Sequence, residues 1–368
     1  MKTILVFTYG DANNPKTWSN VPYLFTKALE KKGIKVIKID ISTKQNIFMY
    51  LYSLICKIIK PETTYYFVKS KWNLKIVEKK IKKAIKQYDN EVDAYISISF
   101  DFSPNKYTNK KVLLISDWPI SYAIEKRFQR KPDFLEKRDI KLHKEIIENA
   151  TYRISLFKDV AEYMNKNYNC HTEYISPLIN SFYPIKDFDK IENRNKITFI
   201  GKKSYYQSAI KLIKAFQKIS IEKLELHIIG MNQNDFPQIK NKTNIYFHGY
   251  LDKGNKKEQE LYYQILKETL VIVNTNNKWA GMSSILESMY YYRPIITSPY
   301  DEFVKTFSKK INFGYYSENT EQDIHKNLKK IINLTKEEYK KMSFAAHNSV
   351  KEFTYDKYTD KVLDYINQ

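Results

Sequence analysis

The feature that most constrains the fold is an alternation of short apolar strands with amphipathic helices, which breaks once and then resumes. Residues 2–8 form an apolar run that predicts a strand, residues 21–32 carry apolar side chains at helical spacing, and residues 34–41 predict the next strand. A strand–helix–strand unit of this kind builds parallel sheets. Further strands are predicted in the first half, at 93–99, 111–116 and 151–156.

The break lies at residues 176–195, which are polar and aperiodic and contain Pro184, as is typical of a connection between domains. The alternation then restarts, with strands predicted at 196–201, 224–230, 244–248, 269–274 and 294–297 and helices at 209–218, 257–266 and 284–291. The tail from 341 onward is predicted to be helical. We therefore expect two doubly wound α/β domains at 1–180 and 196–350, a linker at 181–195 and a C-terminal helix at 351–368.

Length and composition exclude several classes of protein. No stretch approaches the ~20 apolar residues that cross a bilayer, and the first seven residues lack the cleavage site of a signal peptide, so a cytoplasmic protein is expected. Cys56 and Cys170 have no CxxC partner, and the six His residues show no ligand spacing. Neither a disulfide nor a metal site is expected.

The chain is strongly basic, with 62 Lys and Arg against 41 Asp and Glu and a net charge of +21. Part of this excess lies in residues 41–90, which contain 11 Lys and three acidic residues, interleaved with aromatic residues from Phe48 to Trp72. The mixture fits an anionic membrane surface, and it fits equally a helical hairpin that packs its apolar side on the sheet and leaves Lys in water. No helix-turn-helix, RNA-recognition or zinc module appears, so no nucleic-acid partner is expected.

The segment richest in chemistry is residues 279–289, with the sequence WAGMSSILESM. Its small residues open a predicted helix, so the backbone amides of Gly281, Met282, Ser283 and Ser284 are placed to receive a diphosphate at the positive helix end. Glu287, one turn further in, would accept hydrogen bonds from ribose hydroxyls. The alternative is an ordinary capped helix with a Glu that faces solvent.

This segment resembles the signature of glycosyltransferase family 4, which reads Glu-Gly, six residues, a second Glu, a small-residue stretch and Pro-Val-Ile. Glu287 matches the second Glu, and residues 293–296 match the strand that follows. Trp279 stands at the position of the first Glu and Ala280 at that of the Gly. In the family the first Glu contacts hydroxyls of the transferred sugar, so the resemblance leaves the donor sugar open.

Three upstream segments resemble the same family. In residues 197–216 the match runs from a strand through Gly201 to a helix that ends at Ala-Phe, with Lys202 at the family's Arg and Gln207 at its Lys. The resemblance implies that these residues lie beside the leaving diphosphate, where Lys202 supplies a point charge and Gln207 does not. Residues 226–232 and 245–252, which include Gly230 and Gly249, resemble the strand ends that frame the nucleotide base. For Lys202 an ordinary surface lysine is the alternative.

Two segments of the first half resemble the acceptor side of the family. In the loop of residues 10–22, Ser19 and Asn20 stand where the family carries a Gly pair near the diphosphate and acceptor, and Trp18 could stack on a sugar face. A helix cap and ordinary packing explain these three residues equally well. Residues 113–119 resemble a segment that often reads His-Asp, with Ser116 at the His. Asp117 is then the best-placed acid to contact or deprotonate an acceptor hydroxyl, or else a surface Asp at a turn.

The resemblance implies the GT-B fold: two Rossmann-like doubly wound domains that face each other across a cleft, with the C-terminal helix returning to the N-terminal domain. It also implies transfer of a sugar from a nucleotide-diphosphate sugar to a hydroxyl of a glycan or lipid-linked acceptor, in bacterial surface polysaccharide or glycoconjugate synthesis. The transfer is expected to retain the configuration of the sugar and to need neither a cofactor nor a metal ion. If the basic segment docks on a membrane, the protein is expected at the inner face of the cell membrane. The alternative is a GT-B-like protein that binds a glycan or partner without transfer, because Trp279 and Gln207 replace charged family positions.

Overall fold

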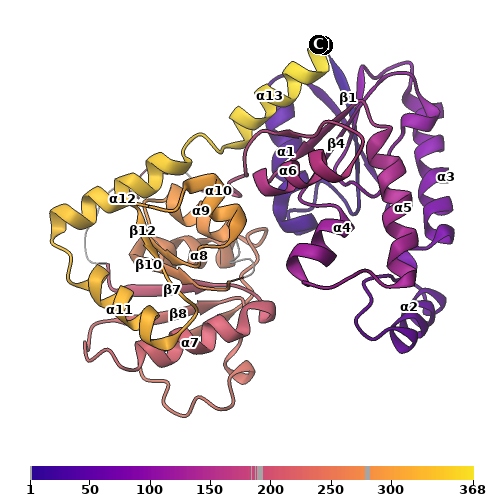
Figure 1. Ribbon diagram of the computed structural model, residues 1–368. Coiled ribbons are helices and arrows are strands. Elements are labelled where there is room, and N and C mark those ends of the chain that lie inside the picture. Colours follow the sequence, from indigo (N-terminus) through magenta and orange to yellow (C-terminus); the bar gives the residue numbers. More distant parts are fainter. Residues whose placement is uncertain (1, 184, 187, 189–193, 278–281) are drawn as a thin grey trace. The chain divides into compact units, whose positions relative to one another are not determined.

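The chain folds into two compact units, as a computed structural model shows (Figure 1). It describes residues 2–183, 185, 186, 188, 194–277 and 282–368. One unit consists of Met1–Pro177 together with Tyr355–Gln368, and the other of Leu178–Thr354. In the described residues each unit contains one six-stranded sheet whose neighbouring strands are all parallel. The expected α/β class with two doubly wound sheets is therefore confirmed.

The sheet of the N-terminal unit has the strand order β2-β1-β3-β4-β5-β6. Its strands are β1 (Thr3–Thr8), β2 (Lys35–Asp40), β3 (Ala94–Ser97), β4 (Lys111–Ser116), β5 (Tyr152–Ser155) and β6 (Glu173–Tyr174). The α-helices between them are α1 (Val21–Lys31), α2 (Ile47–Ile59), α3 (Lys71–Tyr88), α4 (Ile120–Tyr122), α5 (Phe134–Glu148) and α6 (Lys158–Asn167). Apolar side chains of α3, α5 and α6 form one core with the alternate residues of β1, β3 and β4.

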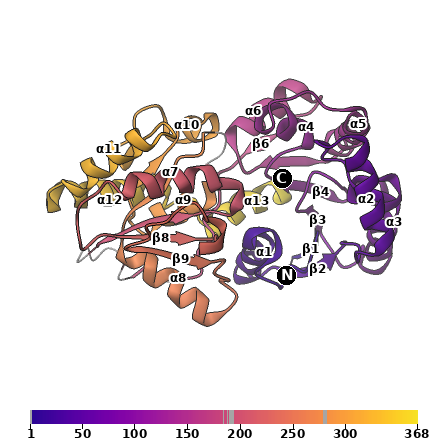
Figure 2. The same ribbon diagram turned by 90° about the horizontal axis from the view of Figure 1, so that it is seen from below.

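The sheet of the C-terminal unit has the order β12-β11-β10-β7-β8-β9. Its strands are β7 (Lys196–Ile200), β8 (Glu225–Ile229), β9 (Ile245–Gly249), β10 (Thr269–Asn274), β11 (Ile295–Thr297) and β12 (Gly314–Tyr316). Its helices are α7 (Tyr206–Phe216), α8 (Lys256–Glu268), α9 (Met282–Tyr290), α10 (Asp301–Phe307), α11 (Glu321–Ile332) and α12 (Lys336–Val350). Figure 2 shows α7 and α8 on opposite sides of β8 and β9.

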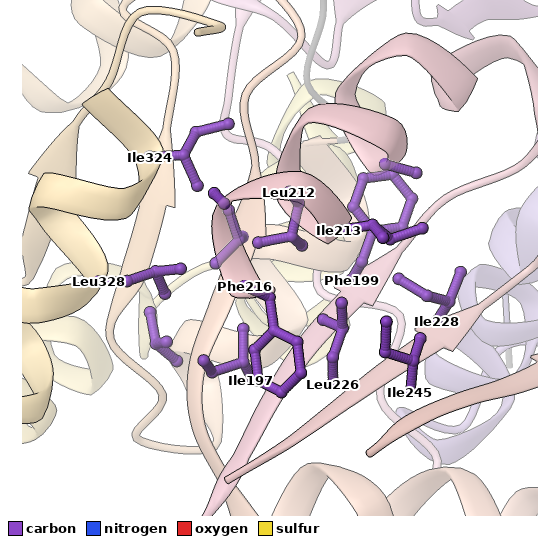
Figure 3. Packing of buried hydrophobic residues seen from close by; sticks show 14 of the residues in the cluster. Ile197, Phe199, Leu212, Ile213, Phe216, Leu226, Ile228, Ile245, Ile324 and Leu328 are labelled. Atoms are coloured by element: carbon purple, nitrogen blue, oxygen red, sulfur yellow. The ribbon is translucent and has the colours of Figure 1, made fainter. Parts of the chain in front are cut away.

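The core of the C-terminal unit explains why its strands and helices alternate in the sequence. Ala209, Leu212, Ile213 and Phe216 repeat at helical spacing and put one face of α7 onto the sheet. Figure 3 shows this face against every second residue of β7, β8 and β9, with α11 closing the side. Fully burying one such large apolar side chain stabilises a fold by about 1.5–3 kcal/mol. The opposite residues of the same strands are left to position polar groups.

The C-terminal helix α13 (Tyr355–Asn367) belongs to the N-terminal unit, as expected for the GT-B fold. It packs on α1, where the rings of Phe25 and Tyr358 lie 6.1 Å apart and Lys32 pairs with Asp360 at 2.6 Å. The helical tail predicted from 341 onward is two helices, because α12 ends at Val350 and α13 begins at Tyr355, after four intervening residues.

Helices α2 and α3 cover most of residues 41–90, for which the sequence fitted both a membrane surface and a packed helical hairpin. Helix α3 packs on the sheet as a hairpin arm would, with Val77, Ile81 and Ile85 buried. Helix α2 does not, because among its 13 residues only Met49 and Cys56 are buried. Tyr52 is half-buried, and the remaining large apolar side chains of α2 are exposed: Ile47, Phe48, Tyr50, Leu51, Leu54, Ile55, Ile58 and Ile59. Within the described residues, no helix combines the length and the apolar character needed to span a bilayer.

Candidate functional site

The carboxyl ends of β7, β8 and β9 meet at three glycines that the sequence comparison singled out. The Gly201 amide donates to the Ile229 carbonyl at 3.0 Å, and the Gly230 amide donates to the Gly249 carbonyl at 2.6 Å. A Cβ atom on Gly230 would lie 2.5 Å from the Gly201 carbonyl oxygen, and Gly230 has a φ of +100°. Only glycine fits this close approach. A Cβ atom would likewise lie 2.6 Å from Asn232 Oδ1 on Gly249 and 2.8 Å from the Phe199 ring on Gly201, so the three glycines allow close packing at these strand ends.

Lys202 and Gln207 follow this edge, and both side chains are exposed. Lys202 lies before the short 3-10 turn Lys203–Tyr205, and Gln207 lies in the first turn of α7. The Lys202 ammonium lies 6.0 Å from the centre of the Tyr250 ring, beyond the end of β9. An anion at the carboxyl end of β7 would thus find one mobile cation beside it, and a neutral amide at Gln207.

Helix α9 begins after β10 at Met282, which is buried, while Ser283 is exposed and Ser284 is half-buried. Gly281, together with Trp279 and Ala280, lies outside the described residues. The structure therefore places three of the four predicted diphosphate-binding amides at the first turn of α9.

Glu287 is buried, with 2% of its surface exposed, so the solvent-facing alternative is wrong. The hydroxyl of Tyr263 donates to its Oε1 at 2.7 Å, the hydroxyl of Tyr262 donates to its Oε2 at 2.9 Å, and the Lys253 ammonium donates to Oε2. Burial and the charge of Glu287 raise the pKa of both tyrosines well above the ordinary value. The carboxylate thus already has three protein donors, which the sequence did not indicate.

In the N-terminal unit, two adjoining cavities lie at the carboxyl ends of the strands. The smaller, of about 350 Å³, is lined by Trp18, Asp117 and Trp118 among others. The larger, of about 600 Å³, lies between the strand ends and the inner side of α2. Three residues line both cavities: Tyr9, Lys69 and Asp101. These cavities bring together Trp18 and Asp117, which the sequence had placed on the acceptor side.

Asp117 lies directly after β4 and is only partly exposed. Burial raises the pKa of its carboxyl to about 6, although the Trp118 amide at 2.8 Å and the Ser116 hydroxyl at 3.2 Å donate hydrogen bonds to Oδ1 and act against this rise. The charge of Asp101 adds to the rise. A carboxyl that titrates near neutral pH in a cavity is suited to take or give a proton.

Trp18, Ser19 and Asn20 form a short helical turn with left-handed backbone, at φ values of 36°, 54° and 75°. Such angles favour glycine, which is a physical reason for a Gly pair at the corresponding place in similar sequences. Asn20 precedes α1 but makes no capping hydrogen bond with its side chain, which donates to the Pro15 carbonyl instead. The helix-cap explanation of Asn20 is therefore wrong.

Sequence reasoning missed a chain of charged residues behind these cavities. His143 of α5 lies between two carboxylates, with Nδ1 at 3.2 Å from Asp101 Oδ1 and Nε2 at 3.2 Å from Asp139 Oδ1. The ammonium of Lys69 lies 3.3 Å from the other Asp139 oxygen. Asp139 and His143 are four positions apart on one helix face, which is the only local signal. Asp101 and Lys69 come from distant loops, and no motif joins them.

Solved structures share this architecture. The structure titled Anabaena Alr3699/HepE in complex with UDP and glucose covers 99% of this chain and 100% of its own, with a TM-score of 0.63 and 11% identity. The structure of WaaG, a glycosyltransferase involved in lipopolysaccharide biosynthesis, covers 100% of this chain and 99% of its own, with a TM-score of 0.62 and 11% identity. With its two six-stranded parallel sheets, the chain is a protein of the GT-B fold.

The sequence itself points to the family. Residues 184–349 match the family model described as glycosyl transferases group 1. The chain is also 22% identical over 279 residues to an uncharacterized glycosyltransferase of Methanocaldococcus jannaschii, MJ1069, across 70% of either chain. The match to glycosyl transferases group 1 lies within the C-terminal unit, where the motifs resemble glycosyltransferase family 4.

Proposed function

We propose that the protein transfers a sugar, with retention of configuration and without a metal ion, from a nucleotide-diphosphate sugar to a hydroxyl of a glycan or lipid-linked acceptor. The product would enter a bacterial surface polysaccharide or glycoconjugate. The observation that carries the proposal is the meeting of Gly201, Gly230 and Gly249 at the carboxyl ends of β7, β8 and β9, the edge where doubly wound sheets bind ligands, within the segment that matches the family. UDP in one similar structure, and lipopolysaccharide synthesis by another, support the choice of donor class and product class.

In this proposal the donor diphosphate lies against Gly201, Lys202, Gln207, Gly281 and the first turn of α9, from Met282 to Ser284. The base lies between Gly230 and Gly249, and the ribose at Glu287. Negative charge grows on the diphosphate as the sugar leaves, so fixed amides and one cation stabilise the transition state more than the bound donor. The three protein donors of Glu287 mean that a ribose hydroxyl would have to share this carboxylate with Lys253.

The acceptor is assigned to the N-terminal unit, at the cavity lined by Trp18, with Ser19 and Asn20 in the adjoining turn. Asp117 contacts the acceptor hydroxyl there, and the raised pKa of its carboxyl supports this role. The competing function is glycan or partner binding without transfer, which the neutral side chain at Gln207 favours. Release of nucleoside diphosphate from a sugar nucleotide separates the two functions.

A membrane location is part of the proposal, and α2 supports it. Its 13 residues form a helix about 20 Å long, the size of helices that lie in the headgroup region with an apolar face buried about 5–10 Å deep. Residues 41–60 contain three Lys and no Asp or Glu, which fits a surface of anionic lipid. We assign the exposed face of α2 to such a membrane, where a lipid-linked acceptor would be found.

A thermal-shift screen of the wild-type protein against uridine, guanosine, adenosine, cytidine and thymidine diphosphates tests donor binding. A ligand that binds only the native state at 100 times its dissociation constant adds about 2.7 kcal/mol of stability. We expect one diphosphate to raise the melting temperature and the Gly230→Ala variant to lose this response. No shift with any of the five would contradict the donor assignment.

A further inference from the structure

The strongest feature that the proposed donor chemistry does not use is the charged chain behind the cavities of the N-terminal unit. In order it runs from Lys69 through Asp139 and His143 to Asp101, with successive side-chain nitrogen and oxygen atoms 3.2 to 3.3 Å apart. Helix α5, which carries Asp139 and His143, is fixed at its start by a capping box between Asp133 and Glu136. The two inner members of the chain are therefore held on a rigid element.

Exposure is lowest in the middle of this chain, since the Lys69 side chain at one end is 19% exposed and lines both cavities. The side chains of Asp139 and His143 are 3% and 6% exposed, whereas that of Asp101 is 38% exposed and lines both cavities. Asp139 Oδ2 and His143 Nδ1 are buried and make no aligned hydrogen bond within the described part of the chain, although charged partners lie close. Burial of imperfectly paired charges costs stability. The cost is explained if these residues hold the carboxylate of Asp101, the most exposed of the four, in place.

We propose that the carboxylate of Asp101 accepts a hydrogen bond from a hydroxyl of the sugar acceptor, and that His143, held by Asp139, is a positioning residue that fixes this carboxylate. The inference rests on the proposed function and adds the group that receives the acceptor. Carboxylate oxygens of Asp101 and Asp139 lie 3.2 Å from the two ring nitrogens of His143, so a proton on either nitrogen is attracted to the carboxylate that faces it. Rotation of the Asp101 carboxylate is thereby restricted, as substrate positioning requires.

The charges at the smaller cavity indicate the class of acceptor. Asp101, Asp117 and Lys69 line it, and the ammonium of Lys69 lies 3.3 Å from Oδ2 of Asp139. Two carboxyl groups accept hydrogen bonds and repel anions, so neighbouring hydroxyls of a neutral sugar ring fit, whereas a phosphate group does not.

Binding of neutral sugars by saturation-transfer NMR tests the inference, with the methyl glycosides of glucose, galactose, mannose and N-acetylglucosamine as probes. We expect at least one to bind the wild-type protein, and Asp101→Asn to weaken it about 10- to 100-fold, since a hydrogen bond to a charged group is lost. His143→Gln keeps an amide near the position of Nε2 and should weaken binding about as much. His143→Asn keeps one near Nδ1, beside Asp101, and should restore most of the affinity.

Asp159→Asn is the matched control, because Asp159 is a buried carboxylate that accepts a 2.5 Å hydrogen bond from Tyr122 and lines neither cavity. Its affinity for the glycosides should equal that of the wild-type protein. Equal binding by all variants, a lack of rescue by His143→Asn, or no binding of any probe by the wild-type protein would overturn the inference. Nucleoside diphosphate binding, measured on the same samples, tests the proposed function separately, because that site lies in the other unit.

Discussion

The half-buried carboxyl of Asp117 is expected to affect both the stability and the activity of the protein. Its pKa is about 6 in the folded protein against about 3.9 in an unfolded chain, so the folded state binds the extra proton between these values. Stability therefore falls as the pH rises from about 4 to 6, and the loss is complete above pH 6. Asn at this position keeps the acceptor oxygen for the Trp118 amide and removes the charge.

We predict that Asp117→Asn stabilises the protein at pH 7.5 by on the order of 1–2 kcal/mol and has a much smaller effect at pH 5, where the wild-type carboxyl is mostly protonated. Sugar transfer should fall at least 100-fold, because the group that contacts the acceptor hydroxyl is lost. Urea unfolding at the two pH values measures the first effect. An equal change in the free energy of unfolding at both would show that burial does not raise this pKa.

Glu287 gives a second prediction at this scale. Glu287→Ala should destabilise the C-terminal unit by about 3 kcal/mol, because it leaves Lys253 and two tyrosine hydroxyls without their shared acceptor. Tyr263→Phe removes one neutral donor and should cost only about 1 kcal/mol. Denaturant unfolding of both variants measures these losses. If Glu287→Ala lowers the free energy of unfolding as little as Tyr263→Phe does, the buried hydrogen bonds of Glu287 do not stabilise the unit as we expect.

Residues of the candidate site differ in how far the sequence could predict them. Gly201, Gly230 and Gly249 follow apolar runs at strand ends, so their meeting at one sheet edge follows from parallel topology. Trp18 and Asp117 were placed on one side by the family resemblance, and they line one cavity. Asp101 and His143 could not be paired, because a contact between loops far apart in sequence leaves no periodic trace. The partners of Glu287 were hidden for the same reason.

At the scale of elements, regular strands were predictable and the outer face of α2 was not. Strands β4 and β10 have the bounds that their apolar runs indicated, since a buried parallel strand is apolar throughout. In residues 47–59 nearly every position is apolar, so no stripe marks the buried side. Only the packing of Met49 and Cys56 onto the unit shows which face remains outside.

The membrane proposal is tested on α2. Vesicles of phosphatidylcholine and phosphatidylglycerol should sediment the protein, and Ile58→Ser should lower the bound fraction about tenfold, since a fully buried Ile contributes about 1.5–3 kcal/mol. Ile221→Ser is the matched control, because Ile221 is also exposed but lies in the other unit. Salt should weaken binding only in part, because insertion of apolar side chains is not screened.

The lysines of α3 should matter less than α2. Lys80 donates to the Ser42 carbonyl and Lys82 lies over the Tyr107 ring at 4.8 Å, so replacement of Lys79, Lys80, Lys82 and Lys83 by Gln changes groups that are partly engaged within the protein.

A bound fraction that is insensitive to Ile58→Ser would contradict the assignment of α2 to lipid. A dimer in size-exclusion chromatography that Ile58→Ser dissociates would assign α2 to a second copy of the chain.

At the scale of the whole molecule, the two α/β units were predictable because the strand–helix alternation runs twice. The return of the C-terminal helix to the N-terminal unit was implied by the family resemblance, and it begins at Tyr355. The family resemblance in residues 184–349 then connects the C-terminal unit to sugar nucleotides. Trp279 and Gln207 stand at positions that carry charged residues in the family. These differences bear on the turnover of sugar nucleotides and not on the fold.

Turnover of sugar nucleotides tests the central claim most directly. Purified protein is incubated with a panel of nucleotide-diphosphate sugars, with and without glycan acceptors, and the released nucleoside diphosphate is measured. We predict release from at least one donor, a loss of about 100-fold in kcat for Lys202→Ala because one charge-stabilising group is removed, and unchanged kcat for Lys218→Ala, whose ammonium pairs with Glu321. No release from any donor by the wild-type protein would contradict the assignment as an active glycosyltransferase.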